Sequence, residues 1–192
     1  MKHLFSIIAL LIVLSSLAFA QEGKMTLGLG AEVALPSGTF GDVAGTGFGG
    51  TVNFLYDIND QIAISGTAGY LTWGKKSVGA GAFSFEWTYS AIPILAGGRY
   101  YFTKCGEGLY GSAEIGLYMF TVKTKSPGYS ILGVTYGGGE VSASSSEFAF
   151  APGVGYEMPI SDMMNFDALA KYVVISNTSH IDVRVGINYK IN

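Results

Sequence analysis

Strict alternation of apolar and polar residues is the feature that most constrains the fold of this chain. In the last ten residues, VRVGINYKIN, every second residue is apolar, from Val183 to Ile191. Arg184, Asn188 and Lys190 stand between the apolar residues. Because successive side chains of a β-strand point to opposite faces, this pattern predicts a strand with one apolar face and one polar face.

The same period of two recurs along most of the chain. Seven further segments show it: Met25–Leu35, Gly47–Tyr56, Gln61–Trp73, Glu86–Phe102, Leu109–Thr121, Glu147–Met158 and Phe166–Ile175. No segment has a convincing helical period. In the fourth segment the apolar side changes near Pro93, where we expect either a β-bulge or a change of environment. The pattern predicts an all-β fold of eight antiparallel strands.

The connections between these segments alternate in length. Long connections follow the first, third and fifth strands: Pro36–Thr46, Gly74–Phe85 and Ser126–Ser145. Shorter connections follow the second, fourth and sixth: Asp57–Asp60, Thr103–Glu107 and Pro159–Asn165. The last connection, Asn177–His180, is also short. This rhythm predicts an up-and-down barrel with long loops at one end and tight turns at the other.

Alternation alone is compatible with two kinds of barrel. A soluble barrel of the lipocalin type turns its apolar face inward around a ligand, whereas a membrane barrel inverts that order. Charged residues make up 13% of the 192-residue chain, about half the usual share in soluble domains. The polar face consists largely of Gly, Ser, Thr and Asn, which suit the narrow interior of eight strands. The composition therefore favours a transmembrane β-barrel.

The few charges on the polar face have both signs. We expect a structural network of paired side chains in the barrel interior, made of Glu32, Arg99, Glu114, Glu157, Asp167, Lys171, Asp182 and Arg184. Buried charges need partners of opposite sign or water, so a mixed set is typical of an interior.

Aromatic residues gather at the strand ends beside the short turns. The set that we expect to form an interfacial girdle against membrane lipid is Tyr56, Tyr100, Phe102, Tyr156, Phe166 and Tyr189. Aromatic rings prefer the boundary between hydrocarbon and headgroups. Because lipid offers no hydrogen-bond partners, the sheet can have no free edge within the membrane. We therefore expect the last strand to pair with the first.

The first twenty residues differ from the rest of the chain. A positive start, MKH, precedes the apolar run LFSIIALLIVLSSL, and small residues at Ala18 and Ala20 precede Gln21. These features predict a secretory signal peptide over residues 1–20, and the apolar run is too short for a spanning helix. We expect residues 21–192 to form the barrel domain. Its only cysteine, Cys105, has no partner for an internal disulfide.

Several stretches resemble the small outer-membrane β-barrel proteins, the outer membrane protein beta-barrel domain group with its OmpA-, OmpX- and OmpW-like members. They are the signal peptide, GLGAEVALPSGTF at the first strand, IPILAGGRYYF in the fourth, and the last strand. The resemblance covers essentially all of residues 21–192. It implies a bacterial outer-membrane location with both termini in the periplasm, and no cofactor.

The last strand also resembles the signal that the barrel-assembly machinery reads in this family. Arg184, Gly186, Tyr189 and Ile191 fit the spacing of that assembly signal. The family usually has an aromatic residue at the final position, where this chain has Ile191 followed by Asn192. The resemblance makes the barrel-assembly machinery an expected partner during biogenesis.

Enzymatic chemistry has one candidate. His180 lies near Ser176, Ser179 and Asp182, and a hydrolytic site needs a base within reach of its nucleophile. Ser176-Asn177 is similar to a lipid A deacylase motif, in which a histidine stands two positions before the serine. Here that position is Val174. We therefore expect no catalytic residues, and we expect His180 to be a rim histidine in a polar loop.

Other chemistry has little support. The glycine runs lack the Lys-Ser/Thr that a phosphate loop requires, and we find no cluster with metal-ligand spacing. A formal charge of −3 argues against nucleic-acid partners. We expect a structural or surface-interaction role, with a side-chain-filled interior and an extracellular ligand reached through the long loops. Within Ser126–Ser145, Tyr129–Tyr136 is either a contact surface or an extension of the hairpin. The alternatives are a narrow channel or binder of small hydrophobic molecules, as OmpW-like relatives suggest, and, more remotely, a lipid A-modifying enzyme.

Overall fold

The computed structural model describes residues 23–78, 85–131 and 134–191. The expected signal peptide lies outside these residues. The described part contains eight strands and one short helix. The strands are β1 (Met25–Pro36), β2 (Gly47–Asp57), β3 (Ile62–Val78), β4 (Phe85–Tyr101), β5 (Gly108–Ile131), β6 (Val134–Pro159), β7 (Met164–Ile175) and β8 (His180–Ile191).

The eight strands form one closed barrel in which each strand pairs antiparallel with its neighbours in sequence. The predicted fold class is confirmed. β8 pairs with β1 from Met25↔Ile191 to Pro36↔His180, which closes the sheet at a seam between the two ends of the barrel domain. At this seam Gly186 lies opposite Gly30, and a Cβ on Gly186 would lie 2.3 Å from the carbonyl oxygen of Leu29. The close approach of β1 and β8 therefore requires glycine.

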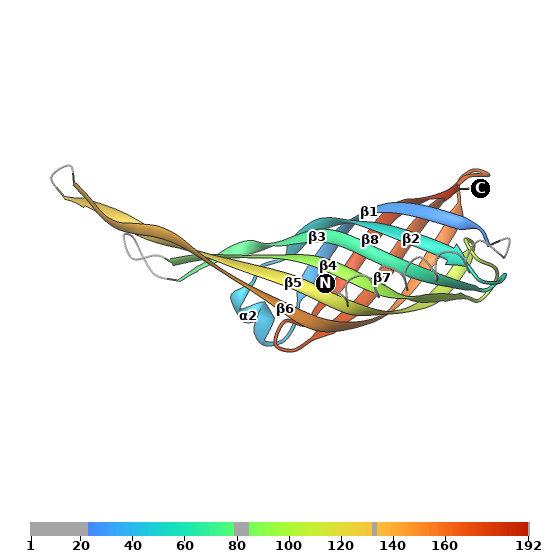
Figure 1. The fold of residues 1–192 in the computed structure, drawn as a ribbon, viewed down its shortest axis with the longest axis horizontal. Helices are drawn as coiled ribbons and strands as arrows, with labels where there is room; N and C mark the ends of the chain where they lie inside the picture. The colour runs from blue at the N-terminus through green and yellow to red at the C-terminus, as the bar shows by residue number, and fades with distance from the viewer. Residues whose placement is uncertain (1–22, 79–84, 132–133, 192) are drawn as a thin grey trace, which may run out of the picture.

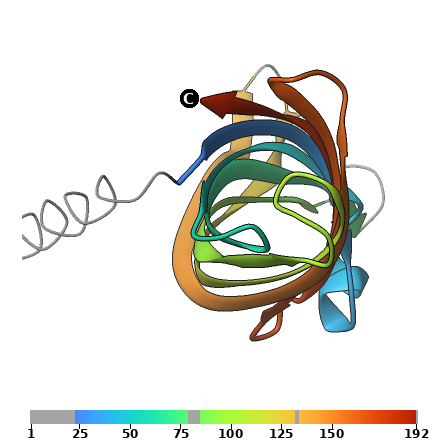
Figure 2. The same cartoon turned by 90° about the vertical axis from the view of Figure 1, so that its right-hand side faces the viewer.

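The barrel has two unlike ends (Figure 1). The end with the tight turns β2–β3, β4–β5 and β6–β7 also carries the C-terminus, and we call it the short-turn end. The opposite end carries the β3–β4 and β5–β6 hairpins, and we call it the hairpin end. Figure 2 views the barrel from the short-turn end, with the strands tilted around the axis as in other closed sheets.

Two of the expected long connections are largely strand where the structure describes them. β5 and β6 stay paired through Tyr129↔Tyr136 and Ile131↔Val134, so the hairpin extends far beyond its neighbours (Figure 1). The expected extension of the hairpin over Tyr129–Tyr136 is confirmed, and the expectation of a loop over Ser126–Ser145 is wrong. β3 likewise continues to Val78 and β4 begins at Phe85, so the described residues of the expected Gly74–Phe85 connection belong to strands. Alternation weakens in these Gly- and Ser-rich stretches because neither face packs in a barrel interior or against lipid.

Of the two expectations for Pro93, the β-bulge is wrong. The β4–β5 register is unbroken past Pro93↔Tyr118, and the β3–β4 register is the same on both sides of it. The irregularity lies instead between Trp73 and Lys76 of β3. There, Gly74 leaves the ladder and exchanges backbone hydrogen bonds with the first long connection at Gly45 and Thr46.

That first connection contains the helix α2 (Thr39–Val43), which periodicity did not predict because it has only five residues. Gly38 precedes it at φ 58° and ψ −141°, a conformation that only glycine adopts readily. The turn directs Phe40 into the hairpin end of the barrel, where the ring is buried. No helix in the described part of the chain is long and apolar enough to cross a membrane.

Candidate functional site

The two faces of the sheet separate by chemistry. Large apolar side chains cover the outside, and Leu29 and Phe48 expose more than half of their surface. The inward side chains include aliphatic residues such as Leu71, Leu95 and Val173, but most of the larger ones are polar, charged or aromatic. Along the barrel axis they form three groups: an arginine cluster (Arg99, Arg184, Asp167 and Glu157), a lysine cluster (Lys171, Glu32, Glu114 and Asp182), and an aromatic cap (Phe40, Trp73, Tyr89, Tyr118, Phe120 and His180).

Asp167 is the centre of the arginine cluster. Arg99 donates to it with both terminal nitrogens, Nη1 to Oδ1 at 3.2 Å and Nη2 to Oδ2 at 3.4 Å. Arg184 Nη1 donates to Oδ2, and the Tyr110 hydroxyl donates to Oδ1 at 2.6 Å. The ring of Tyr110 also lies under the Arg99 guanidinium at 4.5 Å. One carboxylate thus receives bonds from β4, β5 and β8, a geometry that suits the planar fork of arginine.

Neutral side chains complete the arginine cluster. Arg184 donates to Thr51 Oγ1 at 3.0 Å and to Asn53 Oδ1, both on β2. Glu157 accepts from the Tyr101 hydroxyl at 2.6 Å and from Asn188 Nδ2 at 2.9 Å. These donors and acceptors satisfy charges that would otherwise be costly inside the barrel.

The lysine cluster places three carboxylates around one ammonium. Lys171 Nζ lies 3.2 Å from Glu32 Oε1, 3.7 Å from Glu114 Oε2 and 3.9 Å from Asp182 Oδ2. Thr67 donates to Glu114 at 2.7 Å. All eight charged residues expected inside the barrel are therefore buried and distributed between two clusters.

The aromatic cap fills the hairpin end. Phe40 packs edge-on against Trp73 and Tyr89, with ring centroids 5.5 Å apart in both pairs, and against Phe120 at 6.5 Å. Trp73 and Phe120 are themselves buried. Ring contacts of this kind are among the more favourable core interactions. Phe40 therefore acts as a plug that α2 delivers into the mouth of the barrel.

His180 does not lie where the sequence led us to expect. It is fully buried, because β8 begins at His180 and the residue shares the inward face of Asp182 and Arg184. Ser176 is exposed, and the Ser179 hydroxyl donates to the backbone oxygen of Ile175 at 2.8 Å. The structure thus does not bring these serines to the imidazole. Within the described ranges, no group of three or more His, Cys, Asp or Glu is placed to hold a metal ion.

A family model described as "Outer membrane protein beta-barrel domain" matches residues 6–190. The chain belongs to this family. It is therefore an integral protein of the bacterial outer membrane, and its apolar outer face contacts lipid. No curated protein matches its sequence.

Solved structures similar to this outer-membrane barrel share its fold at low identity. Ail, the attachment invasion locus protein of Yersinia pestis, is 14% identical with a TM-score of 0.57, over 89% of this chain and 100% of that one. Neisserial surface protein A is 18% identical with a TM-score of 0.51, over 87% and 97%. OprG from Pseudomonas aeruginosa is 11% identical with a TM-score of 0.50, over 88% and 96%.

Five of the six aromatic residues expected in the girdle lie exposed on the outside of the outer-membrane barrel. They are Tyr100, Phe102, Tyr156, Phe166 and Tyr189. Tyr56 is only 8% exposed, because the backbone of Gly23 lies against its ring. All four residues of the assembly-signal pattern lie on β8 at the seam. Arg184 is buried inside the barrel, and Tyr189 and Ile191 are exposed on the outer face.

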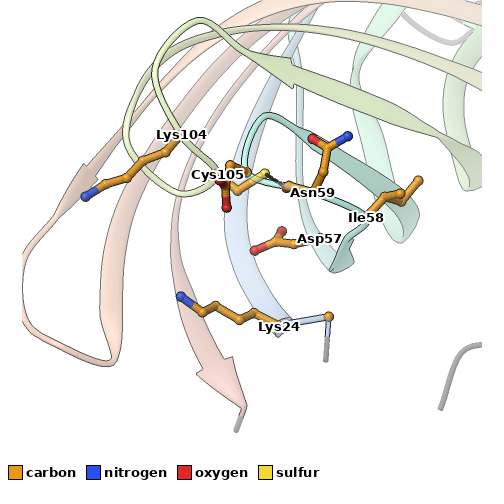
Figure 3. Close-up of a pocket in the computed structure, with 8 residues that line it drawn as sticks. Lys24, Asp57, Ile58, Asn59, Lys104 and Cys105 are labelled. Atoms are coloured by element: carbon orange, nitrogen blue, oxygen red, sulfur yellow. Dashed lines mark hydrogen bonds between the residues drawn. The ribbon is translucent and has the colours of Figure 1, made fainter. Parts of the chain in front are cut away.

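The short-turn end of the outer-membrane barrel contains a cavity of about 380 Å³ (Figure 3). Lys24, Asp57, Asn59, Lys104 and Cys105 line it. The backbone amide of Cys105 donates to the backbone oxygen of Asp60 at 2.6 Å, and its thiol donates to the backbone oxygen of Asn59 at 3.3 Å. These two bonds connect the β4–β5 turn to the β2–β3 turn. Burial, and then the charge of Asp57, raise the pKa of the Cys105 thiol to about 12.

Some interior residues were missed in the sequence. Tyr110 and Tyr118 lie at even-numbered positions of β5, as Glu114 does, so their place on the inward face could have been predicted from the alternation. The amides and hydroxyls that bind Arg184 had no distinguishing signal beyond parity. Phe40 had none, because a loop residue has no strand face.

Proposed function

We propose that this protein is a non-conducting outer-membrane barrel that presents its long β5–β6 hairpin to extended segments of other proteins outside the cell. In this proposal the termini and short turns are periplasmic, and the hairpin end is extracellular. The free edge of β6 is the observation that carries the interaction role.

The edge arises because the strands differ in length. β6 pairs with β7 only from Ala149↔Ile175 onward, so Val134–Phe148 pair with β5 alone. Residues Val141–Ser146 are all exposed. An unpaired strand edge is a template for adding a strand from a partner.

Beyond the barrel, β3 forms the other unpaired edge of the sheet, and this edge is better protected. β3 pairs with β2 only as far as Gly47↔Trp73, but the stretch beyond contains Lys75 and Lys76 and the register shift. Lysine and bulges are common devices against edge pairing. Val134–Phe148 contains no lysine and no proline, and its charges are Glu140 and Glu147. The contrast supports β6 as the interacting edge.

The interaction role is tested with cells that express the full chain. One variant lacks residues 125–140, and its control lacks residues 76–86, which shortens the β3–β4 hairpin. We expect the first variant to lose binding to an array of immobilised extracellular proteins while the control retains it. Equal binding by the wild-type chain and both variants would defeat the proposal.

The side-chain-filled interior supports the non-conducting part of the proposal. The two charged clusters and the aromatic cap follow one another along the axis, and all their side chains are buried except Tyr89, which is half-buried. Planar-bilayer recording of the refolded full chain is the test, and we expect no discrete openings. Steady openings of defined size would instead favour the narrow channel.

We infer a non-enzymatic role from the position of His180. The ring is buried among aromatic side chains, and its nearest acid is Asp182 at 3.4 Å. Lipid A from cells that express the wild-type chain or His180→Ala is compared by mass spectrometry, and we expect identical spectra. A modification that depends on His180 would overturn this inference.

The assembly and targeting roles are part of the same proposal. The last strand would be read by the barrel-assembly machinery through Arg184, Gly186, Tyr189 and Ile191. The five exposed aromatic residues would set the depth of the barrel in the membrane, as such rings do at lipid interfaces. Residues 1–20 would direct export and be removed.

A further inference from the structure

The two charged clusters of the interior differ in their charge balance. The arginine cluster has two guanidinium groups against Asp167 and Glu157 and is neutral. The lysine cluster has one ammonium against three carboxylates. Burying unpaired charge is costly, and such groups take up a counter-charge or a proton instead. The lysine cluster therefore has room for additional positive charge.

Unpaired atoms show where that charge is missing. Asp182 Oδ1 and Glu32 Oε2 are buried and accept no hydrogen bond from the described residues. His180 Nε2 is also buried, lacks a hydrogen-bond partner there, and lies 3.4 Å from Asp182 Oδ1. The gap between the imidazole and this carboxylate is thus bordered by two unsatisfied atoms.

The other ring nitrogen of His180 decides which tautomer is present. Nδ1 lies 2.9 Å from the Thr178 carbonyl oxygen, which can only accept, so Nδ1 carries a hydrogen. In a neutral ring, Nε2 would then direct a lone pair at the Asp182 carboxylate. Two facing acceptors repel each other, and one proton between them removes the conflict.

We propose that His180 and Asp182 bind a proton at the border between the lysine cluster and the aromatic cap, and that this proton holds the cap in place. The proton resides on Nε2, so the ring is an imidazolium and its Nε2–H points at Asp182 Oδ1. The positive charge offsets part of the negative excess around Lys171. This proton site is distinct from the β6 edge and does not depend on it.

The surroundings of the ring suit a cation. The rings of Trp73 and Tyr118 lie 5.4 Å from the imidazole and that of Phe40 lies 6.4 Å away. Aromatic rings within about 6 Å stabilise a cation. The Tyr118 hydroxyl donates to Asp182 Oδ2 at 3.3 Å and so orients the carboxylate. The charged groups facing the pair are Lys171 of β7, Glu32 of β1 and Glu114 of β5.

The link to α2 runs through Phe40. Its ring contacts both His180 and Trp73, and within α2 only Phe40 is buried. Loss of the proton would place repelling acceptors directly beneath this contact and weaken the docking of α2. The barrel mouth is thus tightest when the pair holds this proton.

Ring-nitrogen NMR tests the proton site directly. The full chain carrying His3→Gln contains one histidine, because His3 and His180 are the only two. In a lipid nanodisc at pH 7.5 we expect hydrogens on both ring nitrogens of His180. Asp182→Asn should remove the one on Nε2 at the same pH. A wild-type ring that is protonated on Nδ1 alone would overturn the proposal, as would an Asp182→Asn ring that keeps both hydrogens.

Trp73 fluorescence tests the coupling to α2. Trp87→Phe leaves Trp73 as the only tryptophan. At pH 7.5 we expect the Trp73 emission of Asp182→Asn to lie at longer wavelength than that of the same chain with Asp182, because the variant lacks the proton on Nε2. Equal emission wavelengths, when Asp182→Asn has lost the Nε2 hydrogen, would refute the coupling. Slower migration after boiling identifies variants that fold, and only those are compared.

Discussion

Arg99 Nη1 lies 3.2 Å from Asp167 Oδ1, and neither side chain reaches the barrel surface. The same carboxylate also receives Arg184. Asp167 therefore pairs with two buried arginines from β4 and β8, whereas Glu157, the second acid of the cluster, pairs only with Arg99 among the described residues. The stability of the whole barrel should depend on Asp167 more than on any exposed ion pair.

Replacing Asp167 with Asn tests this dependence. The amide cannot accept two guanidinium groups, so two buried positive charges lose a partner. We expect the free energy of unfolding to fall by about 3–5 kcal/mol, measured by urea titration in detergent with the gel shift as readout. Asp60→Asn removes the same charge from an exposed turn residue and should leave the midpoint unchanged. Equal midpoints for the two variants would contradict the role given to Asp167.

Gly186→Ala should disturb the seam. The new methyl group would lie 2.3 Å from the Leu29 carbonyl oxygen and 2.8 Å from Gly30 Cα, so β1 and β8 would have to separate. Overpacking of this kind costs about 1–3 kcal/mol, and we expect a smaller fraction of the chain to reach the gel-shifted form. Gly66→Ala is the matched control, because a Cβ there meets nothing within 4 Å. A seam tolerant of alanine would give the same folded fraction for both.

Cys105 should react slowly with alkylating reagents. Its thiol pKa is raised to about 12, and only the thiolate is nucleophilic. At pH 8 we expect iodoacetamide to label the folded protein more than about a hundredfold more slowly than the urea-unfolded chain. Asp57→Asn removes a nearby negative charge, lowers the thiol pKa and should speed the reaction. Labelling of the folded wild type at the unfolded rate would show that the thiol is not held in this environment.

A charge on the outer face should be costly only within the lipid. Val185 lies on the outer face of β8, and we expect Val185→Lys to lower the free energy of unfolding by about 2–4 kcal/mol in lipid vesicles. Val141 of the protruding hairpin is 74% exposed, and Val141→Lys should change the free energy of unfolding little. Similar losses at both positions would mean that Val185 does not face hydrocarbon.

Alternation was sufficient to predict the barrel because lipid and a narrow interior impose opposite demands on adjacent residues. In β8 this places Val183 and Val185 outside and Arg184 inside, as the sequence indicated. Where one environment is absent, the signal fails. The hairpin beyond Lys125 is flanked by neither lipid nor an interior, so the sequence could not decide whether Tyr129–Tyr136 forms a contact surface or extends the hairpin.

The interior could be predicted as a set but not as a structure. Parity identified the eight buried charges, yet it could not separate a balanced arginine cluster from an unbalanced lysine cluster, because partners such as Arg99 and Asp167 come from distant strands. His180 was misplaced because its position at the start of β8 depends on pairing with Pro36. Phe40 enters the barrel from a loop, where no periodicity applies.

The seam between β1 and β8 has a consequence for the order of events during biogenesis. Glu32 of β1 depends on Lys171, and Asn53 and Thr51 of β2 bond to Arg184 of the final strand. The first strands to be made thus carry polar groups whose partners are made last. A chain released before β8 would expose unmatched charge along its leading edge, so the interior itself distinguishes complete barrels from truncated ones.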